Sequence, residues 1–437
     1  MNNFQIESIK VEELFGYYNY KLEKGIGDVS NNLIILYGDN GTGKSTILKI
    51  LYYLFSNKTR SGHKSKLANI PFRRIEVKLL NGDTIIAERN PQLEQYTGNY
   101  TLHYIHDSED IICPIICKKD DEEDDFYVKI SEGTEEYELY TKFLSAFKDL
   151  SILYIPDNRK EIGTNDNDDE YIRRKRISRS RVDSHEIIRE EKIEKEVGLL
   201  QEWIVNRALS ATKKGEEGTS EIYAKILSQF SKSKQTLQIK PKLEDIKAKI
   251  LSIAKKTESY VSMGFLSKPD YESVLTMIEK VQQKNVESVY NILSPYMEMQ
   301  ENKLNALDDL VETISHFNNS LNKYLYRKTI SYSVSKGFEV KPIGKKDTID
   351  LKNLSSGEKQ LILLFSMVIR KSEECPIIII DEPEISLNIK WQRMLMDTLQ
   401  YFVKNSNTQF IIATHSFELL SSHTRDTIKL VSKDIEA

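Results

Sequence analysis

Eight consecutive residues, 38 to 45, combine the residue types that bind a phosphate group. They read Gly38-Asp39-Asn40-Gly41-Thr42-Gly43-Lys44-Ser45 and fit the pattern G-x-x-x-x-G-K-[ST]. Glycines let the backbone curl so that N–H groups point at phosphate oxygens. Lys44 is expected to reach the β- and γ-phosphates, and the Ser45 hydroxyl is expected to reach Mg²⁺. The predicted nucleotide-binding residues here are Gly38, Asn40, Gly41, Thr42, Gly43, Lys44, Ser45 and Thr46.

Two acidic residues at the end of an apolar run form a second chemical element. The run 377–380 consists of four isoleucines and predicts a strand buried on both faces, and Asp381 and Glu382 follow it directly. Burying two carboxylates without partners would cost on the order of several kcal/mol. We therefore expect Asp381 to hold Mg²⁺ through water, and Glu382 to orient or deprotonate an attacking water as a catalytic residue.

Two more segments are candidates for the same site. Leu354-Ser355-Ser356-Gly357-Glu358 predicts a helix start capped by serine, in which Ser355 and the free N–H groups face a γ-phosphate. His415 follows the apolar run 410–413, a position that predicts a catalytic role. The alternatives are an ordinary capped helix and a structural histidine. The predicted nucleotide-binding residues of the segment 354–358 are Ser355, Ser356, Gly357 and Glu358.

The elements that must position these residues alternate between strand and helix at both ends of the chain. Residues 33–37 predict a buried strand, 45–55 a helix, and 151–156 a short strand stopped by proline. Residues 74–89 alternate around Asn81-Gly82, a strong hairpin signal. We expect the two ends to be halves of one α/β domain, with a β-rich extension on the first half.

The middle of the chain, from about His185 to Tyr326, is rich in Glu and Lys and follows helical spacing. We expect breaks near Gly215–Gly218, Pro241, Pro269 and Pro295, which would divide it into about four or five helices. No heptad pattern persists for many turns, so a compact helical lobe is predicted and not a long coiled coil.

In their order along the chain and in their sequences, these motifs resemble those of the ABC-type ATPases. The inserted lobe and the run Asp381-Glu382-Pro383-Glu384 are similar to the SMC, RecF and OLD branch, and to the ATP-binding subunits of prokaryotic antiphage defence systems such as PARIS. Ser356 stands where the signature of the family has glycine, and Glu358 where it has glutamine. Asn388-Ile389 stands where OLD-like chains often have His-Pro, and 157–159 is the candidate region for the Q-loop.

The resemblance implies a P-loop ABC-type ATPase head of the α/β class with a β-rich N-terminal extension and an inserted helical lobe. The implied domains are 1–160 and 329–437 for the two halves of the head and 185–328 for the lobe. It also implies ATP and Mg²⁺ as cofactors and a homo-oligomer, at least a dimer. In that dimer two ATP molecules lie between two heads, each site completed by the Ser355–Glu358 segment of the other subunit.

Composition narrows the class of protein further. The 437 residues include 62 Lys and Arg against 66 Asp and Glu, a net charge of −4 that excludes a strongly basic nucleic-acid coat. Three cysteines exclude a disulfide scaffold. The start carries no secretory signal, and no apolar run approaches bilayer length, so we expect a cytoplasmic protein with no membrane association. Acidic and basic runs within 118–125 and 165–181 predict solvated loops or a partner surface.

Two functions remain open at this point. The first is an ATP-dependent switch that controls a separately encoded effector, in antiphage defence, because the segment 416–437 is too short for the TOPRIM nuclease of OLD chains. The second is a RecF-like ATPase that binds DNA during repair. A transporter subunit is disfavoured, because Lys44 and Ser355 lie too far apart along the chain.

Overall fold

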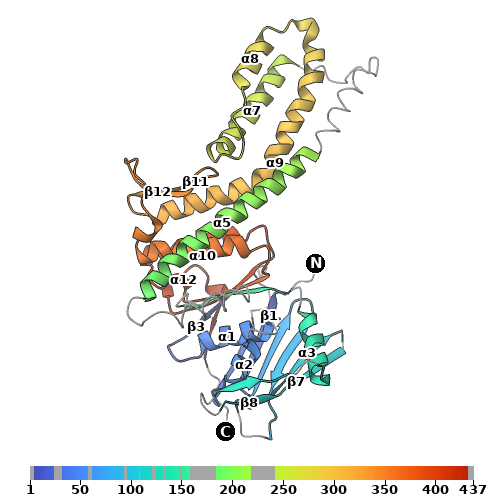
Figure 1. Ribbon diagram of the computed structural model, residues 1–437, viewed down its shortest axis with the longest axis vertical. Coiled ribbons are helices and arrows are strands. Elements are labelled where there is room, and N and C mark those ends of the chain that lie inside the picture. The colour runs from blue at the N-terminus through green and yellow to red at the C-terminus, as the bar shows by residue number, and fades with distance from the viewer. Residues whose placement is uncertain are drawn as a thin grey trace. The chain divides into compact units, whose positions relative to one another are not determined.

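The computed structural model describes residues 4–23, 32–57, 62–92, 96–107, 109–120, 125–130, 133–147, 150–157, 184–217 and 242–431. The chain divides into two compact units, coloured by residue number in Figure 1. The first unit comprises Met1–Arg189 and Val368–Ala437, and the second comprises Glu190–Met367. The domain boundaries expected from the sequence stay a prediction.

A five-stranded parallel sheet lies at the centre of the first unit, in the order β10-β13-β14-β3-β15. Its members are β3 (Leu33–Tyr37), β10 (Ile152–Ile155), β13 (Ile377–Asp381), β14 (Gln409–Thr414) and β15 (Thr427–Lys429). Every residue of β13 and β14 is buried, as their continuous apolar runs predict. Because the strands are parallel, their carboxyl ends meet at one edge of the sheet, where the motif residues follow.

A six-stranded antiparallel sheet forms the β-rich extension, in the order β2-β1-β4-β5-β6-β7. Its strands are β1 (Ile6–Leu14), β2 (Tyr18–Glu23), β4 (Arg74–Leu79), β5 (Thr84–Glu88), β6 (Tyr100–His106) and β7 (Glu109–Ile115). The hairpin predicted at Asn81-Gly82 joins β4 to β5, and Gly82 has a φ of 92° that suits glycine. A small sheet of β8 (Cys117–Lys119) and β9 (Phe126–Val128) lies beside α2 (His63–Ala68).

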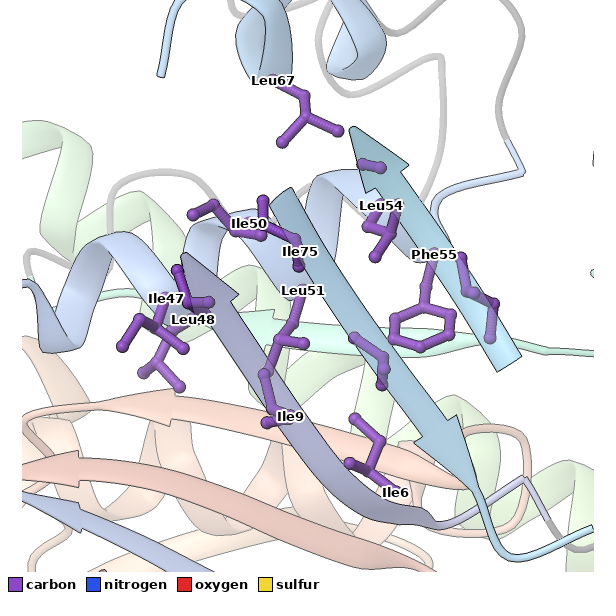
Figure 2. Packing of buried hydrophobic residues seen from close by; sticks show 14 of the residues in the cluster. Ile6, Ile9, Ile47, Leu48, Ile50, Leu51, Leu54, Phe55, Leu67 and Ile75 are labelled. Atoms are coloured by element: carbon purple, nitrogen blue, oxygen red, sulfur yellow. The ribbon is translucent and has the colours of Figure 1, made fainter. Parts of the chain in front are cut away.

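Helix α1 (Lys44–Phe55) packs against strands of both sheets, so the first unit has one shared core. Figure 2 shows Ile47, Leu48 and Leu51 of this helix beside Ile9 and Ile75 of the antiparallel sheet. The same cluster contains residues of β13 and β14. The remaining helices of this unit are α3 (Glu135–Ala146), α11 (Ile389–Phe402), α12 (Phe417–Leu420) and the short η3 (Thr424–Asp426). Burial on two sides therefore fixes the helix that begins with Lys44.

The second unit is mainly helical, as the sequence predicts. Its elements are α5 (Ser184–Glu217, of which the residues up to Arg189 belong to the first unit), α7 (Leu243–Ser262), α8 (Tyr271–Glu279), η1 (Gln283–Asn285), α9 (Val286–Tyr324), β11 (Lys328–Ser333), β12 (Gly337–Pro342), η2 (Leu351–Asn353) and α10 (Ser356–Lys371). α7 and α9 pack side by side, and β11 and β12 form a hairpin next to the end of α9 (Figure 1). α10 begins in this unit and its last residues, from Val368, belong to the first.

The break expected at Pro295 is wrong, because α9 continues through that residue. Proline in a helix removes one hydrogen bond and costs about 3 kcal/mol. Here the ring of Pro295 is buried, as are Met297, Leu304 and Leu307 further along the same helix. Tertiary packing of the apolar face therefore outweighs the local penalty. The break at Pro269 is confirmed, since it lies between α7 and α8, whereas Pro241 is outside the described residues.

In the described part of the chain, every helix is too short or too polar to cross a lipid bilayer.

Candidate functional site

The phosphate-binding loop, residues 38–45, joins the end of β3 to the start of α1 in the predicted context. Gly41 and Gly43 have φ values of 83° and 81°, which only glycine adopts without strain. Lys44 is 5% exposed, and its Nζ donates to the carbonyl oxygens of Gly38 at 2.7 Å and Asp39 at 2.9 Å. The ammonium group therefore lies across the concave side of the loop, where a phosphate would bind.

Ser45 and Asp381 meet across the edge of the parallel sheet. The Ser45 Oγ donates to Asp381 Oδ1 at 3.0 Å, although the residues are 336 positions apart. Asp381 is 2% exposed, and burial raises the pKa of its carboxyl to about 6, with the charges of Asp157 and Glu382 acting in the same direction. A hydroxyl and a carboxylate are oxygen ligands that Mg²⁺ prefers, so this pair fits the ion, whose charge would favour the ionised aspartate.

His415 lies between the lysine of the loop and the second acid. Its Nδ1 is 3.3 Å from Lys44 Nζ, and its Nε2 is 3.0 Å from Glu382 Oε1. An ammonium group can only donate, so Nδ1 is the acceptor and Nε2 carries the hydrogen toward Glu382. The ring therefore links the cation that binds phosphate to the carboxylate predicted to activate water.

The backbone at Glu382 is held in an unusual conformation. Its φ is +46°, and its N–H donates to the carbonyl oxygen of Ala413 in the neighbouring strand at 2.9 Å. A non-glycine residue in this region costs about 1–3 kcal/mol and persists only where the surroundings enforce it. The turn directs the Glu382 side chain to the edge of the sheet, beside His415.

Two opposing effects act on the pKa of Lys44, and burial is the larger. Burial lowers the pKa of its ammonium group, while the carboxylates of Glu382 and Asp381 act in the opposite direction. A bound polyphosphate would add negative charge on the same side and favour the charged lysine.

Two tyrosines that sequence reasoning missed support the loop from β2. Tyr18 Oη donates to the carbonyl oxygen of Gly41 at 3.2 Å, and Tyr20 Oη donates to that of Thr42 at 2.8 Å. Burial raises the pKa of Tyr20 to about 12, so its hydroxyl remains a donor. The only signal in the sequence is the tyrosine-rich run 17–20, which does not reveal that its hydroxyls reach the loop.

The signature segment, Leu354–Glu358, lies in the second unit and forms the predicted helix start. The N–H and the Oγ of Ser355 both donate to Glu358 Oε2 at 2.9 Å, and the Glu358 N–H points back to Ser355 Oγ at 3.4 Å. This reciprocal pattern is a capping box, with Ser356 and Gly357 as the first residues of the helix.

Lys328, the first residue of β11, holds the acid of that capping box. Its Nζ donates to both carboxylate oxygens of the buried Glu358 at 2.8 Å. Burial alone would raise the pKa of Glu358, but the hydrogen bonds from Lys328 and Ser355 outweigh it and the pKa is lowered. In this structure the Ser355 hydroxyl therefore serves Glu358, and its contact with a γ-phosphate stays a prediction.

The predicted site residues thus form two groups. The phosphate-binding loop, Asp381, Glu382 and His415 lie together in the first unit, and the signature segment lies in the second. Of the candidate Q-loop region, Asp157 influences Asp381 electrostatically, while residues 158 and 159 are outside the described part of the chain. The runs 121–124 and 165–181 also lie outside it.

A parallel sheet with a phosphate-binding loop, an acidic pair and a histidine at its carboxyl edge defines a P-loop ATPase with an ABC-type head fold. The chain belongs to the AAA ATPase domain family, whose model matches residues 6–420. An ATP-binding ATPase is the function that this membership establishes. No curated protein matches the chain.

Three similar solved structures are heads of Smc proteins. One is the Smc head domain of Pyrococcus furiosus with an extended coiled coil, bound to the C-terminal domain of ScpA, at 16% identity and a TM-score of 0.38 over 98% of this chain and 94% of that one. A second is an Smc head bound to the C-terminal winged-helix domain of ScpA, at 11% identity and a TM-score of 0.35 over 99% and 98%. A third, from Pyrococcus yayanosii, has 14% identity and a TM-score of 0.36 over 98% and 95%.

Proposed function

We propose that the chain binds ATP with Mg²⁺ and hydrolyses it at the edge of the parallel sheet in the first unit. The observation that supports this best is the meeting of five side chains at the carboxyl ends of the three adjacent strands β13, β14 and β3. Lys44, Ser45, Asp381, Glu382 and His415 are joined there by contacts of 3.0–3.3 Å. A loop that binds phosphate would otherwise have no need of a buried acid and a histidine beside it.

Each side chain has a role that its geometry allows. Lys44 and the N–H groups of the loop bind the phosphates, and Ser45 and Asp381 hold Mg²⁺, which would neutralise the developing charge. Glu382 accepts the proton of the attacking water, and His415 keeps that carboxylate beside the γ-phosphate. Positioning and electrostatic stabilisation then supply most of the rate acceleration.

The first test separates binding from hydrolysis. Lys44→Ala should abolish nucleotide binding, because it removes the cation that lies across the loop. Glu382→Gln should bind ATP normally but release phosphate at least about a hundredfold more slowly, because an amide cannot accept the proton. Glu418→Gln, which removes an acid paired with Arg393, is the matched control. Hydrolysis at the wild-type rate by Glu382→Gln would refute the assignment of the base.

We further propose the ABC-type arrangement, in which Ser355 completes the site of a second subunit. Ser355→Arg should block hydrolysis while ATP still binds to the loop. Mixing it with Lys44→Ala should restore part of the activity, because one of the two composite sites in the mixed dimer is intact. No recovery, with mixed dimers demonstrated by a second affinity tag, would exclude action between subunits.

The finer role that we propose is an ATP-driven switch for a separately encoded effector in antiphage defence. Its support is the motif resemblance carried by the signature segment, the run 381–384 and the helical insertion. An ATPase of this kind acts through conformational change that a bound partner senses. Tagged Glu382→Gln, purified from cells that carry the native neighbouring genes, should retain a neighbour-encoded protein. Recovery of the chain alone, with DNA binding that falls steeply with salt, would favour the RecF-like repair function instead.

A further inference from the structure

The turn that carries His415 is organised by one carboxylate oxygen of Glu384. Three donors of the turn point at Glu384 Oε1: the Thr414 hydroxyl, the His415 N–H at 2.9 Å and the Ser416 N–H at 3.2 Å. Hydrogen bonds to a charged acceptor contribute about 1.5–3 kcal/mol each, more than neutral ones. Glu384 therefore fixes the backbone on both sides of the histidine.

A second side chain ties the same turn to the loop that follows β13. Gln392 of α11 accepts a hydrogen bond from the Ser416 hydroxyl at 2.7 Å and donates to the carbonyl oxygen of Leu387 at 2.9 Å. That loop contains Ser386, whose φ is +64°. The turn and the loop are thus linked at two points, by Glu384 at one and Gln392 at the other.

The hydrogen bonds of Glu384 with the described residues are all on one of its two carboxylate oxygens. Oε2 is buried and has no hydrogen-bond partner among the described residues. Leaving a buried polar atom unsatisfied costs about 1–3 kcal/mol, so the three hydrogen bonds at Oε1 must outweigh that cost. Here all the bonding is on the oxygen that faces Thr414, His415 and Ser416.

We propose that Glu384 is a positioning residue that sets the orientation of His415 and, through it, that of Glu382; this rests on the hydrolysis proposed above. The linkage runs from Glu384 Oε1 to the His415 backbone, and from the His415 ring to Glu382 at 3.0 Å and to Lys44 at 3.3 Å. Without Glu384, the turn loses its shared acceptor and the ring is free to leave the line between the two charges. ATP binding through the loop would be unaffected.

A double-mutant cycle with Glu384→Ala and His415→Ala tests this linkage. Glu384→Ala should lower kcat by about 10–100-fold, the loss typical of residues that orient a functional group, with KM within about threefold of wild type. If Glu384 acts through His415, the double variant will be no slower than His415→Ala alone. Losses that multiply in the double variant would overturn the proposal.

The control is Glu374, an acid that precedes β13, whereas Glu384 follows that strand. Glu374 is 58% exposed and pairs with Lys371, so Glu374→Ala should leave kcat unchanged. Glu384→Gln keeps one acceptor oxygen and should be at least about tenfold faster than Glu384→Ala, because its carbonyl can still receive the N–H groups. If Glu384→Ala fails to fold, Glu384→Gln and its double variant with His415→Ala replace it in the cycle. A Glu384→Gln variant as slow as Glu384→Ala would also refute the role, because the acceptor oxygen would then make no difference.

A readout without ATP distinguishes failure of this inference from failure of the proposed function. Nitrogen-15 spectra of the histidine rings, with His415→Asn to assign the signal, should show the Nε2–H form of His415 in the wild-type protein. In Glu384→Ala the signal should instead show a mixture of the Nε2–H and Nδ1–H tautomers of the ring. An unchanged signal would overturn the positioning role even in an active enzyme, whereas a wild-type protein that does not hydrolyse ATP would overturn the proposed function alone.

Discussion

Lys64 gives the sharpest test of the energetics of the first unit. It is 4% exposed, and its Nζ donates to the carbonyl oxygens of Tyr53 at 2.9 Å and Leu54 at 2.6 Å, in the last turn of α1. In the described part of the chain no carboxylate pairs with it, and its Nζ lies over the ring of Phe143, 5.8 Å from the ring centroid. A lysine without a counter-ion thus caps the helix that begins at Lys44.

Burial lowers the pKa of Lys64 from its ordinary value of 10.5 to about 7. Above pH 10.5 the side chain is neutral in both the folded and the unfolded chain. As the pH falls toward 7, the unfolded chain binds a proton that the folded chain does not, so the free energy of unfolding decreases. Each pH unit is worth about 1.4 kcal/mol, and the whole interval is worth about 5 kcal/mol.

Lys64→Met should remove this pH dependence, because methionine fills similar space and does not titrate. Urea unfolding would be followed between about pH 7 and pH 9.5, where most of the interval lies. The chain has two tryptophans, so a Trp203→Phe background leaves Trp391 of α11 as a reporter of the first unit. The stability of the lysine form relative to Lys64→Met should rise by about 1.4 kcal/mol per pH unit.

Lys66→Met is the matched control, because Lys66 lies on α2 with Lys64 but its side chain is exposed. It should show the same pH dependence as the wild-type protein. Parallel stability profiles for Lys64→Met and the wild type would refute the reasoning, since the ammonium would then keep its ordinary pKa despite burial.

Three further substitutions test other contacts. Lys328→Met should destabilise the second unit by about 3–5 kcal/mol, because it leaves the buried carboxylate of Glu358 without its cation. Adding Glu358→Gln should restore most of the lost stability. Urea unfolding in a Trp391→Phe background measures the stability of both variants. Tyr20→Phe should weaken ATP binding about fivefold in a titration, because the donor to the Thr42 carbonyl is lost. Arg89→Lys should lower the free energy of unfolding of the first unit by about 3 kcal/mol in thermal unfolding. Lysine cannot reach the four carbonyl oxygens that the guanidinium contacts.

The sequence by itself determined the elements whose signal is local. Apolar runs at 33–37 and 377–380 predicted buried strands, and the loop of residues 38–45 predicted the turn into α1; both are confirmed. Asn81-Gly82 predicted its hairpin, and the serine and acid of the signature segment predicted a capped helix start. Such features depend on residues within a few positions of one another, so the pattern of types is sufficient.

Only the tertiary structure decided which of these elements are neighbours. A continuous apolar run shows that a strand is buried but not which strand lies beside it, so the order β13-β14-β3 was not readable from the sequence. The same holds for the links from Lys328 to Glu358, from Tyr20 to Thr42 and from Glu384 to the His415 turn, and for the burial of Lys64. Pro295 shows the same limit in reverse, because a local rule that ends helices was outweighed by the burial of the apolar face of α9. In each case the deciding free energy comes from contacts between segments that are distant in the sequence. The spacing of residues along the chain does not show which distant segments will pack together.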